Sequence, residues 1–264
     1  MWERTRQHVR FVVRDGRSVS VLALFLAIAG GACARAVKPL VAPGESAVAL
    51  TGGPNTSMIY LARTSEGILA IDLGWWGSRG ALTDALHELD ATPADVQAVF
   101  LTHSHRDHVA AWRVVRHARF HMSAAERSRF VGEASHRGWI PRFANRIKGT
   151  RLPRAGELDV RTFARDTAFV VGADTLHAYL VAGHTAGTTV YLFRGVLFLG
   201  DAVTYSRRHG FAPAKRGFSD DTRVAAASLE RLWDRLPPGA VRYVCTAHAH
   251  CVAFSPRFLD DVGR

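Results

Sequence analysis

The sequence contains very little lysine. Only three of its 34 basic residues are Lys (Lys38, Lys148 and Lys215), and the others are Arg. Together with abundant Ala and Gly, this shortage indicates a GC-rich coding sequence, so part of the arginine excess is compositional. A formal net charge of +11 could attract nucleic acid or anionic lipid. Because no stripe of alternating basic and aromatic residues accompanies the charge, we do not expect a nucleic-acid partner.

The sequence also lacks the run of roughly 20 apolar residues that a membrane-spanning helix near its N-terminus would need. The apolar run at 19–29 is shorter, follows a stretch with five Arg and precedes the small residues 30–34. An Arg-rich start, a short apolar run and small residues form the pattern of a secretory signal. We therefore predict a signal peptide or N-terminal membrane anchor at 1–34, a linker at 35–45 and one domain at 46–264.

Three fates of the N-terminal segment fit this pattern. Ala32-Cys33-Ala34 fits a cleavage site after Ala34, whereas Cys33 could instead be the lipidated first residue of a bacterial lipoprotein. That motif usually has an aliphatic residue where this chain has Gly30. An uncleaved anchor is the third alternative. In each case the protein is exported or membrane-anchored (periplasm, cell surface or secreted), and any membrane association involves the N-terminus.

Cysteine is scarce, and cleavage at Ala34 would leave only Cys245 and Cys251. Export permits a disulfide between these two residues, which flank His248. Spacing alone does not establish a bridge, and Cys245 lies in an apolar run. We therefore favour a small core residue at Cys245.

The most informative stretch is 101–108, Leu-Thr-His-Ser-His-Arg-Asp-His. It contains three His and one Asp within six residues, directly after the apolar run 96–101, which predicts a buried strand. Side chains at i and i+2 of an extended segment share one side, so His103 and His105 can point to one place. Asp107 and His108 can face a second place nearby. Imidazole and carboxylate groups bind Zn²⁺ and similar ions, so we predict a metal site here.

The His-x-His-x-Asp-His motif resembles the signature of the metallo-β-lactamase-fold hydrolases. Further ligand-type residues of that family follow in the same order, each after an apolar run: Gly183-His184-Thr185, Gly200-Asp201 and Thr246-Ala247-His248. The similarity covers about residues 46–255. It implies one α/β domain with an αββα sandwich fold, and 264 residues that are 48% apolar can supply its core.

The resemblance also implies a ligand set. It assigns His103, His105 and His184 to one metal ion, assigns Asp107, His108 and His248 to a second, and places Asp201 as a bridge. We favour His248 over His250 because the last ligand of the family that this chain resembles directly follows a small residue at a strand end. Two Zn ions, with Fe or Mn as alternatives, would share a hydroxide that attacks the substrate. Asp107 would orient this nucleophile and shuttle a proton.

The residue at the bridging position bears on the substrate. This chain has Asp201 where one large class of true β-lactamases has Cys, so it looks more like the glyoxalase II and lactonase branches. We expect a small-molecule thioester, lactone or other ester substrate. The alternatives are a mononuclear iron oxidoreductase of the same fold, a β-lactamase and a phosphodiesterase. Oligomeric state is not indicated.

Three further positions are candidates near the site. Asp72 resembles the family's Asp-x-Gly, which usually supports the metal loop by hydrogen bonds, although an ordinary turn residue is an equal alternative. Trp75 and Trp76 could line a substrate pocket or cover the sheet edge. Tyr205, four residues after Asp201, is a candidate substrate-binding residue because some lactonases of this fold place a Tyr nearby.

Periodicity and turn residues predict the remaining elements. We expect strands at 47–50, 58–62, 68–72, 96–102, 119–122, 160–163, 168–171, 176–180, 190–193, 196–199 and 241–246. We expect helices at 80–89, at 109–117, after Ser123 in a capping box with Glu126, and at 223–236. Residues 133–154 and 203–221 are predicted to be irregular. The first of these is basic and aromatic, and we favour a solvated connector over a substrate flap.

Overall fold

The structure, a computed structural model, describes residues 35–37, 47–51, 57–75, 78–147, 152–206, 210–249 and 251–262. The chain divides into two compact units, 1–31 and 32–264, and all described residues belong to the second. The predicted signal or anchor therefore lies outside the described residues. Within them, no helix has the length and apolar character needed to cross a membrane.

The first sheet contains seven strands in sequence order: β1 (Arg35–Val37), β2 (Ala47–Thr51), β3 (Ile59–Thr64), β4 (Gly67–Ile71), β5 (Val96–Phe100), β6 (Arg119–Ser123) and β7 (Asp159–Phe163). Strands β1 to β4 pair antiparallel, and β4 to β7 pair parallel. The carboxyl ends of β4 and β5 therefore lie at the same edge of the sheet, where the predicted ligand loop begins. Strand β1 lies inside the range predicted to be a linker.

The second sheet contains six strands in the order β15-β14-β11-β10-β9-β8. Their bounds are β8 (Thr167–Val171), β9 (Asp174–Leu180), β10 (Thr189–Phe193), β11 (Val196–Gly200), β14 (Tyr243–Thr246) and β15 (Cys251–Ala253). The β10–β11 hairpin turns at Arg194-Gly195, as predicted, and both residues have positive φ (48° and 80°). Strands β11 and β14 are parallel neighbours, so Asp201 and His248 follow strands that end at the same edge.

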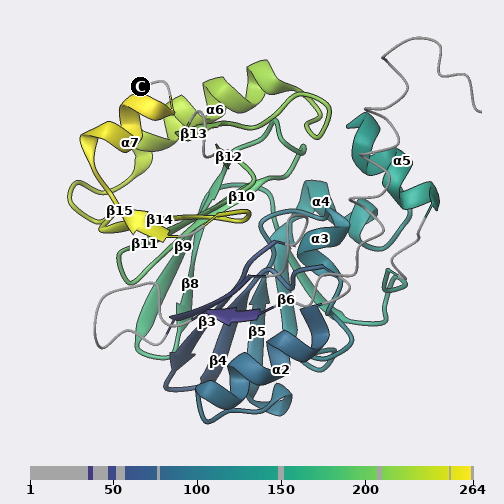
Figure 1. The fold of residues 1–264 in the computed structure, drawn as a ribbon. Helices are drawn as coiled ribbons and strands as arrows, with labels where there is room; N and C mark the ends of the chain where they lie inside the picture. The colour runs from purple at the N-terminus through teal and green to yellow at the C-terminus, as the bar shows by residue number, and fades with distance from the viewer. Residues whose placement is uncertain are drawn as a thin grey trace, which may run out of the picture. The chain divides into compact units, whose positions relative to one another are not determined.

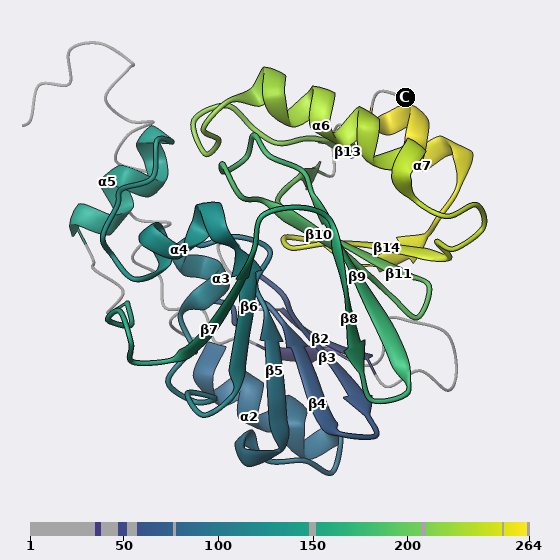
Figure 2. The ribbon, with the colours of Figure 1, turned by 180° about the vertical axis from the view of Figure 1, so that it is seen from behind.

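Helices cover the outer faces of both sheets (Figures 1 and 2). Helices α2 (Ser78–Glu88) and α4 (Ala124–Phe130) lie against the first sheet, and α6 (Thr222–Arg235) and α7 (Pro256–Asp261) lie against the second. The other helices are α3 (Arg106–Val109), a helical turn after β5, α5 (Trp139–Ile147), which lies beside α4, and the short 3₁₀ helix η1 (Pro93–Asp95) before β5. A small hairpin of β12 (Val203–Ser206) and β13 (Gly210–Pro213) precedes α6. This arrangement confirms the predicted αββα sandwich.

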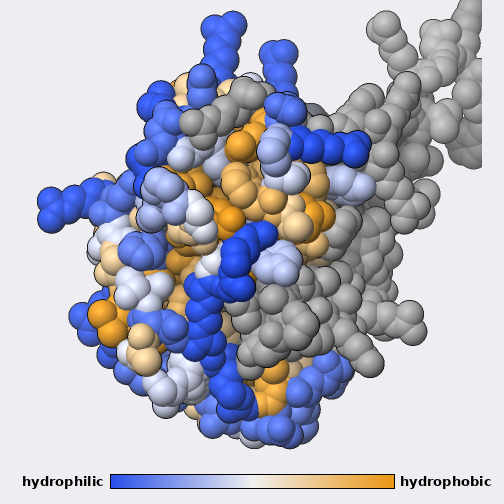
Figure 3. All heavy atoms as spheres, turned by 90° about the vertical axis from the view of Figure 1, so that its left-hand side faces the viewer, coloured by the Kyte–Doolittle hydropathy of each residue, from blue (hydrophilic) through white to orange (hydrophobic). Residues whose placement is uncertain are grey.

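Three hydrophobic clusters form the core and correspond to the layers. The central cluster lies between the sheets and includes Tyr60, Phe100, Tyr191 and Phe198. A second cluster joins the first sheet to its helices, and a third joins the second sheet to α6 and α7. Every residue of β10 and β11 is buried, as expected for strands covered on both faces. On the face shown in Figure 3, hydrophilic side chains project outward and a smaller group of hydrophobic side chains is exposed between them.

The helix expected at 109–117 is wrong. Helix α3 begins earlier, at Arg106, and ends at Val109, and residues 110–117 form consecutive turns. The backbone N–H groups of Ala110 and Ala111 donate to the carbonyls of Gly74 (3.0 Å) and Leu73 (3.2 Å). Because a continued helix would need those donors, the contact with the β4 loop ends it.

Two segments predicted to be irregular contain regular structure. Helix α5 forms within 133–154, with Pro141 in its first turn, where a backbone N–H is not required. The β12–β13 hairpin forms within 203–221. In α5 the apolar residues Trp139, Ile140 and Phe143 have helical spacing, so the prediction of an irregular segment there is wrong, whereas β12 and β13 have four residues each and are too short to show a clear period.

Candidate metal centre

The predicted ligand loop follows β5 directly. Phe100 ends the strand, and residues 101–105 run to the first turn of α3, which carries Asp107 and His108. His105 precedes that helix in an extended conformation (φ −62°, ψ 145°). The short helical turn separates the two halves of the motif, so His103 and His105 face one place and Asp107 and His108 face another.

The first ligand group consists of His103, His105, His184 and Asp201, all of them buried, with ligand atoms within 4.8 Å of one another. His184 Nε2 lies 3.1 Å from His103 Nε2 and 3.0 Å from His105 Nδ1. Burial, more than any neighbouring charge, lowers the pKa of each of the three rings. The rings are therefore neutral near pH 7 and present lone pairs to one point.

The second ligand group consists of Asp107, His108 and His248. His248 Nε2 lies 3.5 Å and His108 Nε2 lies 3.8 Å from Asp107 Oδ2. The side chain of His108 is buried, whereas those of Asp107 and His248 are 20% and 33% exposed. Burial opposes protonation of His248, but the carboxylates of Asp201 and Asp107 outweigh it and raise its pKa to about 9. The exposure of the Asp107 and His248 side chains leaves the second ligand group open to solvent on one side.

Asp201 lies between the two groups. Its Oδ2 is 3.6 Å from His184 Nε2 and 3.7 Å from His108 Nε2, and its Oδ1 is 3.2 Å from His248 Nε2. Burial would raise the pKa of this carboxyl, but His248 and His108 hold it well below its usual range. One ionised carboxylate thus contacts rings of both groups.

The chemistry of these side chains fits metal ions. His108 Nε2 is buried and has no hydrogen-bond partner among the described residues, which is costly unless another group satisfies it. Imidazole nitrogen and carboxylate oxygen are the donors that zinc accepts. These features identify a His/Asp metal-binding site.

Asp72 supports the ligand loop by hydrogen bonds, which is the first of the two roles predicted for it, the other being an ordinary turn residue. Its carboxylate accepts hydrogen bonds from Thr102 N and Thr102 Oγ1, both at 2.7 Å, and lies 2.7 Å from His108 Nδ1. With its Nδ1 proton directed to Asp72, His108 presents Nε2 to the site. Asp72 has a positive φ of 57°, and its three contacts hold it in this uncommon conformation.

Glu126 supports the site in a way that the sequence did not predict. Ser123 caps α4 as expected, but Glu126 does not complete a capping box. Its buried carboxylate instead accepts hydrogen bonds from Ser104 N (2.9 Å), from the Ser104 hydroxyl and from Gly187 N (2.9 Å). It therefore links the loop of His103 and His105 to the loop of His184.

Two other supporting contacts were also not predicted. Ser219 Oγ lies 3.1 Å from His184 Nδ1, and the buried ring of His136 packs against His105 with centroids 4.5 Å apart. A single Ser or His in an irregular stretch gives no sequence signal for such a role.

Hydrogen bonds tie two of the ligand loops, those after β5 and β14, to the opposite sheet. Thr189 N in β10 donates to Thr102 O after β5 (2.8 Å), and Met58 N before β3 donates to Ala247 O after β14 (2.7 Å). The Tyr191 hydroxyl donates to Leu101 O (2.9 Å). The position of the loops therefore depends on the packing of the two sheets.

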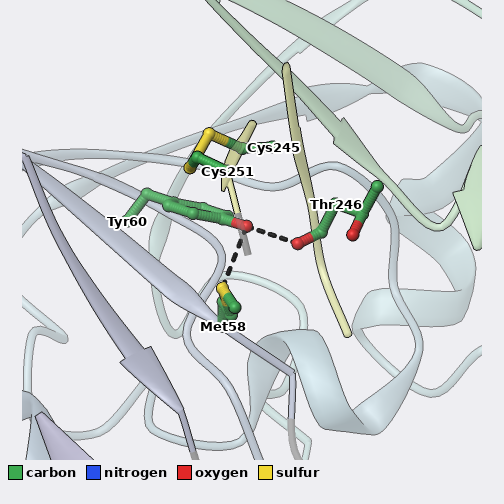
Figure 4. Close-up of a disulfide and its surroundings, with 5 residues drawn as sticks. All are labelled: Met58, Tyr60, Cys245, Thr246 and Cys251. Atoms are coloured by element: carbon green, nitrogen blue, oxygen red, sulfur yellow. Dashed lines mark hydrogen bonds between the residues drawn. A yellow bond between two sulfur atoms is a disulfide. The ribbon is translucent and has the colours of Figure 1, made fainter. Parts of the chain in front are cut away.

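A disulfide joins Cys245 and Cys251 across β14 and β15 (Figure 4). Cys245 is also part of the central core, so it is both a core residue, as favoured from the sequence, and a bridged one. The hydroxyl of Tyr60 donates to Thr246 O and lies 3.2 Å from Met58 Sδ. The disulfide closes the turn that carries His248, and Tyr60 holds the start of that turn.

The other candidate residues lie as follows. The guanidinium of Arg106 stacks on Trp75, 4.5 Å from its centroid, which makes Trp75 part of the packing beside the ligand loop. Tyr205 packs against Phe211 (5.0 Å) beside the third core cluster, and its role in substrate binding stays a prediction. Trp76 and His250 lie outside the described residues.

Comparisons with known proteins agree with this geometry. A family profile described as Metallo-beta-lactamase superfamily matches residues 52–248. A "Probable polyketide biosynthesis zinc-dependent hydrolase BaeB" from Bacillus velezensis is 28% identical over 187 residues, which cover 70% of this chain and 69% of the relative.

Solved structures show the same fold at low sequence identity. BJP-1, a subclass B3 metallo-beta-lactamase of Bradyrhizobium japonicum, has a TM-score of 0.58 and 17% identity, covering 81% of this chain and 77% of its own. A metallo-beta-lactamase family protein from Thermus thermophilus has a TM-score of 0.56 and 21% identity, covering 84% of this chain and 74% of its own. Because the family profile spans most of the sequence and the fold agrees with it, this chain belongs to the metallo-beta-lactamase superfamily.

Proposed function

We propose that the protein is a hydrolase that holds two zinc ions, one in each ligand group, with Asp201 shared between them. The observation that carries this proposal is the position of Asp201, whose carboxylate contacts His184 on one side and His108 and His248 on the other. The zinc-dependent hydrolase among the relatives supports the choice of metal and reaction class.

Two bound zinc ions would supply a hydroxide nucleophile near neutral pH and polarise a substrate carbonyl. The chain's own residues would prepare the site for this chemistry. Neutral His103, His105 and His184 provide three nitrogen donors, and Asp72 orients the ring of His108. Asp107, which is 20% exposed at the open side, would accept a proton from an attacking water and return it to the leaving group.

The proposed substrate is a small molecule with an ester, thioester or lactone carbonyl. Asp at position 201, where one large class of β-lactamases has Cys, supports the glyoxalase II and lactonase branch over a β-lactamase. Zinc binds both Asp and Cys side chains, so Asp201 bears on the choice of substrate branch and not on whether the site can bind metal.

We further propose that residues 1–34 export or anchor the protein, whose catalytic domain would then occupy 46–264. The disulfide supports export, because structural disulfides form and persist in oxidising compartments. N-terminal sequencing and lipid analysis after expression in a bacterial host would test it. A cytoplasmic product with Met1 intact would contradict export, and a lipid on Cys33 would select the lipoprotein version.

Metal analysis followed by a hydrolysis screen tests the enzymatic proposal. Protein produced without added metal should contain about two zinc ions per chain, as expected for a two-metal site. The metal-loaded protein should hydrolyse at least one member of a panel of thioesters, lactones, β-lactams and phosphodiesters. One tightly bound ion at saturation would contradict the two-zinc site, and a single iron would favour the oxidoreductase alternative.

A further inference from the structure

Helix α5 and the neighbouring loop carry three exposed aromatic side chains. Trp139 is 58% exposed, Phe143 is 42% exposed and Phe218 is 45% exposed. Among the described residues, the only other large hydrophobic side chains this exposed are Val170 and Val224. Exposed aromatic residues concentrated on two adjacent segments indicate an interaction surface.

Backbone contacts place these aromatic residues on one surface. Trp139 and Phe143 are four residues apart on α5 and therefore share a face of the helix. Ile140 N donates a hydrogen bond to Gly217 O (3.1 Å), so the loop runs along the first turn of α5. A Cβ at Gly217 would come within 3.1 Å of Trp139 Nε1, which shows that the indole lies against the loop just before Phe218.

The same two segments are positively charged. Arg142 on α5 and Lys215 and Arg216 on the loop are exposed, and none of them forms an ion pair with an acidic side chain in the part of the chain that the structure describes. The nearby carboxylate of Asp220 is already engaged, because it accepts hydrogen bonds from the backbone of residues 137 and 138 and lies 3.5 Å from Arg129. The surface therefore has an excess of positive charge.

We propose that this surface, the α5 patch (Trp139, Phe143, Phe218, Arg142, Lys215 and Arg216), docks onto an anionic lipid bilayer. Trp and other aromatic side chains favour the headgroup region of a membrane, where an apolar ring and a polar edge are both accommodated. Basic residues beside them gain from the negative surface potential of anionic lipids. The α5 patch has both features. Its aromatic side chains suit the headgroup region, and its cations, which lack an acidic partner among the described residues, suit the negative lipid surface.

Docking through the α5 patch is separate from any insertion of the N-terminal segment. The N-terminal segment also carries five Arg and would itself favour anionic bilayers, so the two modes are distinguished by local protection of the α5 patch and not by lipid charge. The proposal also does not depend on the enzymatic function, because none of the six residues belongs to either ligand group.

Amide hydrogen exchange on the full-length protein can test the proposal with local resolution. The protein would be incubated with phosphatidylcholine vesicles containing phosphatidylglycerol, and in parallel with phosphatidylcholine vesicles alone. Exchange in peptides covering 137–147 and 214–219 should slow with the anionic vesicles only. Equal protection by neutral vesicles, or no protection by anionic vesicles, would overturn the proposal.

Paired variants of the full-length protein separate the contributions of the aromatic and basic residues. Trp139→Ser/Phe143→Ser should abolish the local protection, while Val170→Ser/Val224→Ser, which alters exposed apolar residues elsewhere, should retain it. Lys215→Ser/Arg216→Ser should weaken affinity for the anionic vesicles, measured as the lipid concentration that gives half-maximal protection, by about fivefold for each charge removed. Protection that rises with protein concentration without vesicles would indicate a second copy of the chain as partner and would overturn the proposal.

Discussion

The two ligand groups of the metal centre differ in how far the protein encloses them. The first group consists of four buried side chains, and its loops are joined by Glu126. The second group consists of three side chains, two of which are partly exposed, on a helical turn and on a β-turn closed by a disulfide. Both groups draw ligands from both sheets.

This difference suggests a division of labour between the groups. A closed set of four ligands can saturate a tetrahedral zinc ion, as structural sites do, whereas three ligands leave a position for water or substrate. Asp201 modifies this division because it is available to both groups. Each variant below tests whether the first group is the tighter site and the second the site that receives substrate.

The largest effect is expected from Asp201→Asn, which keeps the size of the side chain but removes its charge. Without a shared carboxylate, repulsion between two ions is no longer offset, so hydrolysis should fall by about 10³-fold or more, with reduced occupancy of at least one ion. Metal content and kcat/KM would be measured on the same preparations. Asp84→Asn, on the exposed face of α2, is the matched control.

His250→Ala provides a second comparison for this variant, because we assign the last ligand to His248. It should change metal content and activity far less than Asp201→Asn. Full metal content in Asp201→Asn together with metal loss in His250→Ala would show that the ligand set is wrong.

Removing one ligand from each group should produce different losses. His105→Ala should empty the first group and reduce total zinc strongly, because it removes one of the three nitrogen ligands that lie close together there. His248→Ala should leave one zinc in place and lower activity by about 10²-fold through loss of the second ion. Zinc titration by calorimetry would measure both, with His87→Ala as control. Equal loss from both groups in either variant would remove the distinction between them.

Glu126→Gln should affect the first group more than the second. An amide in place of the carboxylate cannot accept all the hydrogen bonds that Ser104 and Gly187 donate, and an unsatisfied buried N–H costs about 1–3 kcal/mol. Weakened support of this kind typically lowers metal affinity by about 10–100-fold. The control is Glu133→Gln, since Glu133 is 51% exposed and pairs with the exposed Arg127 at the surface. Unchanged zinc affinity in Glu126→Gln would refute the supporting role.

The disulfide should matter mainly for the second group. Replacing both residues (Cys245→Ser/Cys251→Ser) should lower the free energy of unfolding by about 2 kcal/mol, the value expected for so short a loop. Zinc affinity of the second group should fall by less than about tenfold, because Tyr60 still holds Thr246. Treatment of the wild type with a reductant should reproduce this effect, and an effect confined to the first group would contradict it.

The smallest effect concerns pH and lies outside both groups. Burial, more than the nearby Arg119, lowers the pKa of His121 from 6.5 to about 4. Between these two pH values the His121 ring is neutral in the folded chain but protonated in the unfolded chain. Stability should therefore fall as pH decreases from 6.5 to 4, by on the order of 1–2 kcal/mol after allowance for partial exposure.

The variant His121→Leu should remove this contribution. The free energies of unfolding of the metal-free wild type and variant would be measured in denaturant at about pH 7.5, where both states are neutral at His121, and at about pH 4.5, where most of the expected loss has occurred. Part of the loss of stability in acid would then come from His121, and this part must be known before the remainder is attributed to protonation of either ligand group. An identical pH dependence in both proteins would show that His121 does not contribute.

The structure brings the seven candidate ligand residues together because the segments that carry them follow strand ends, although Asp107 and His108 lie on the short helix α3. A strand end fixes where a side chain can point, and ligand residues after parallel neighbours such as β11 and β14 meet at one edge. Asp72 could be predicted for the same reason, since it follows β4 beside the start of the ligand loop. The assignment of these residues to two metal ions and the role of Tyr205 stay predictions.

The supporting contacts could not be predicted because they join segments far apart in the sequence. Glu126 fits a capping box locally, but its carboxylate satisfies donors from two distant loops. Helix α3 ends earlier than expected because the β4 loop accepts the donors of Ala110 and Ala111. In both cases, a partner that folding brings close determined the local structure, and periodicity contains no information about that partner.

The crossed hydrogen bonds between the sheets have a consequence for how the protein matures. Two of the ligand loops, those after β5 and β14, are covalently connected to one sheet and joined to the other by a backbone hydrogen bond, Thr189 to Thr102 or Met58 to Ala247. A chain whose sheets have formed without docking would hold neither ligand group complete. Metal uptake would then be a late event, and stabilisation by the ions would select correctly assembled molecules over trapped intermediates. The zinc content of a refolded preparation would accordingly report the fraction of chains whose two sheets have docked.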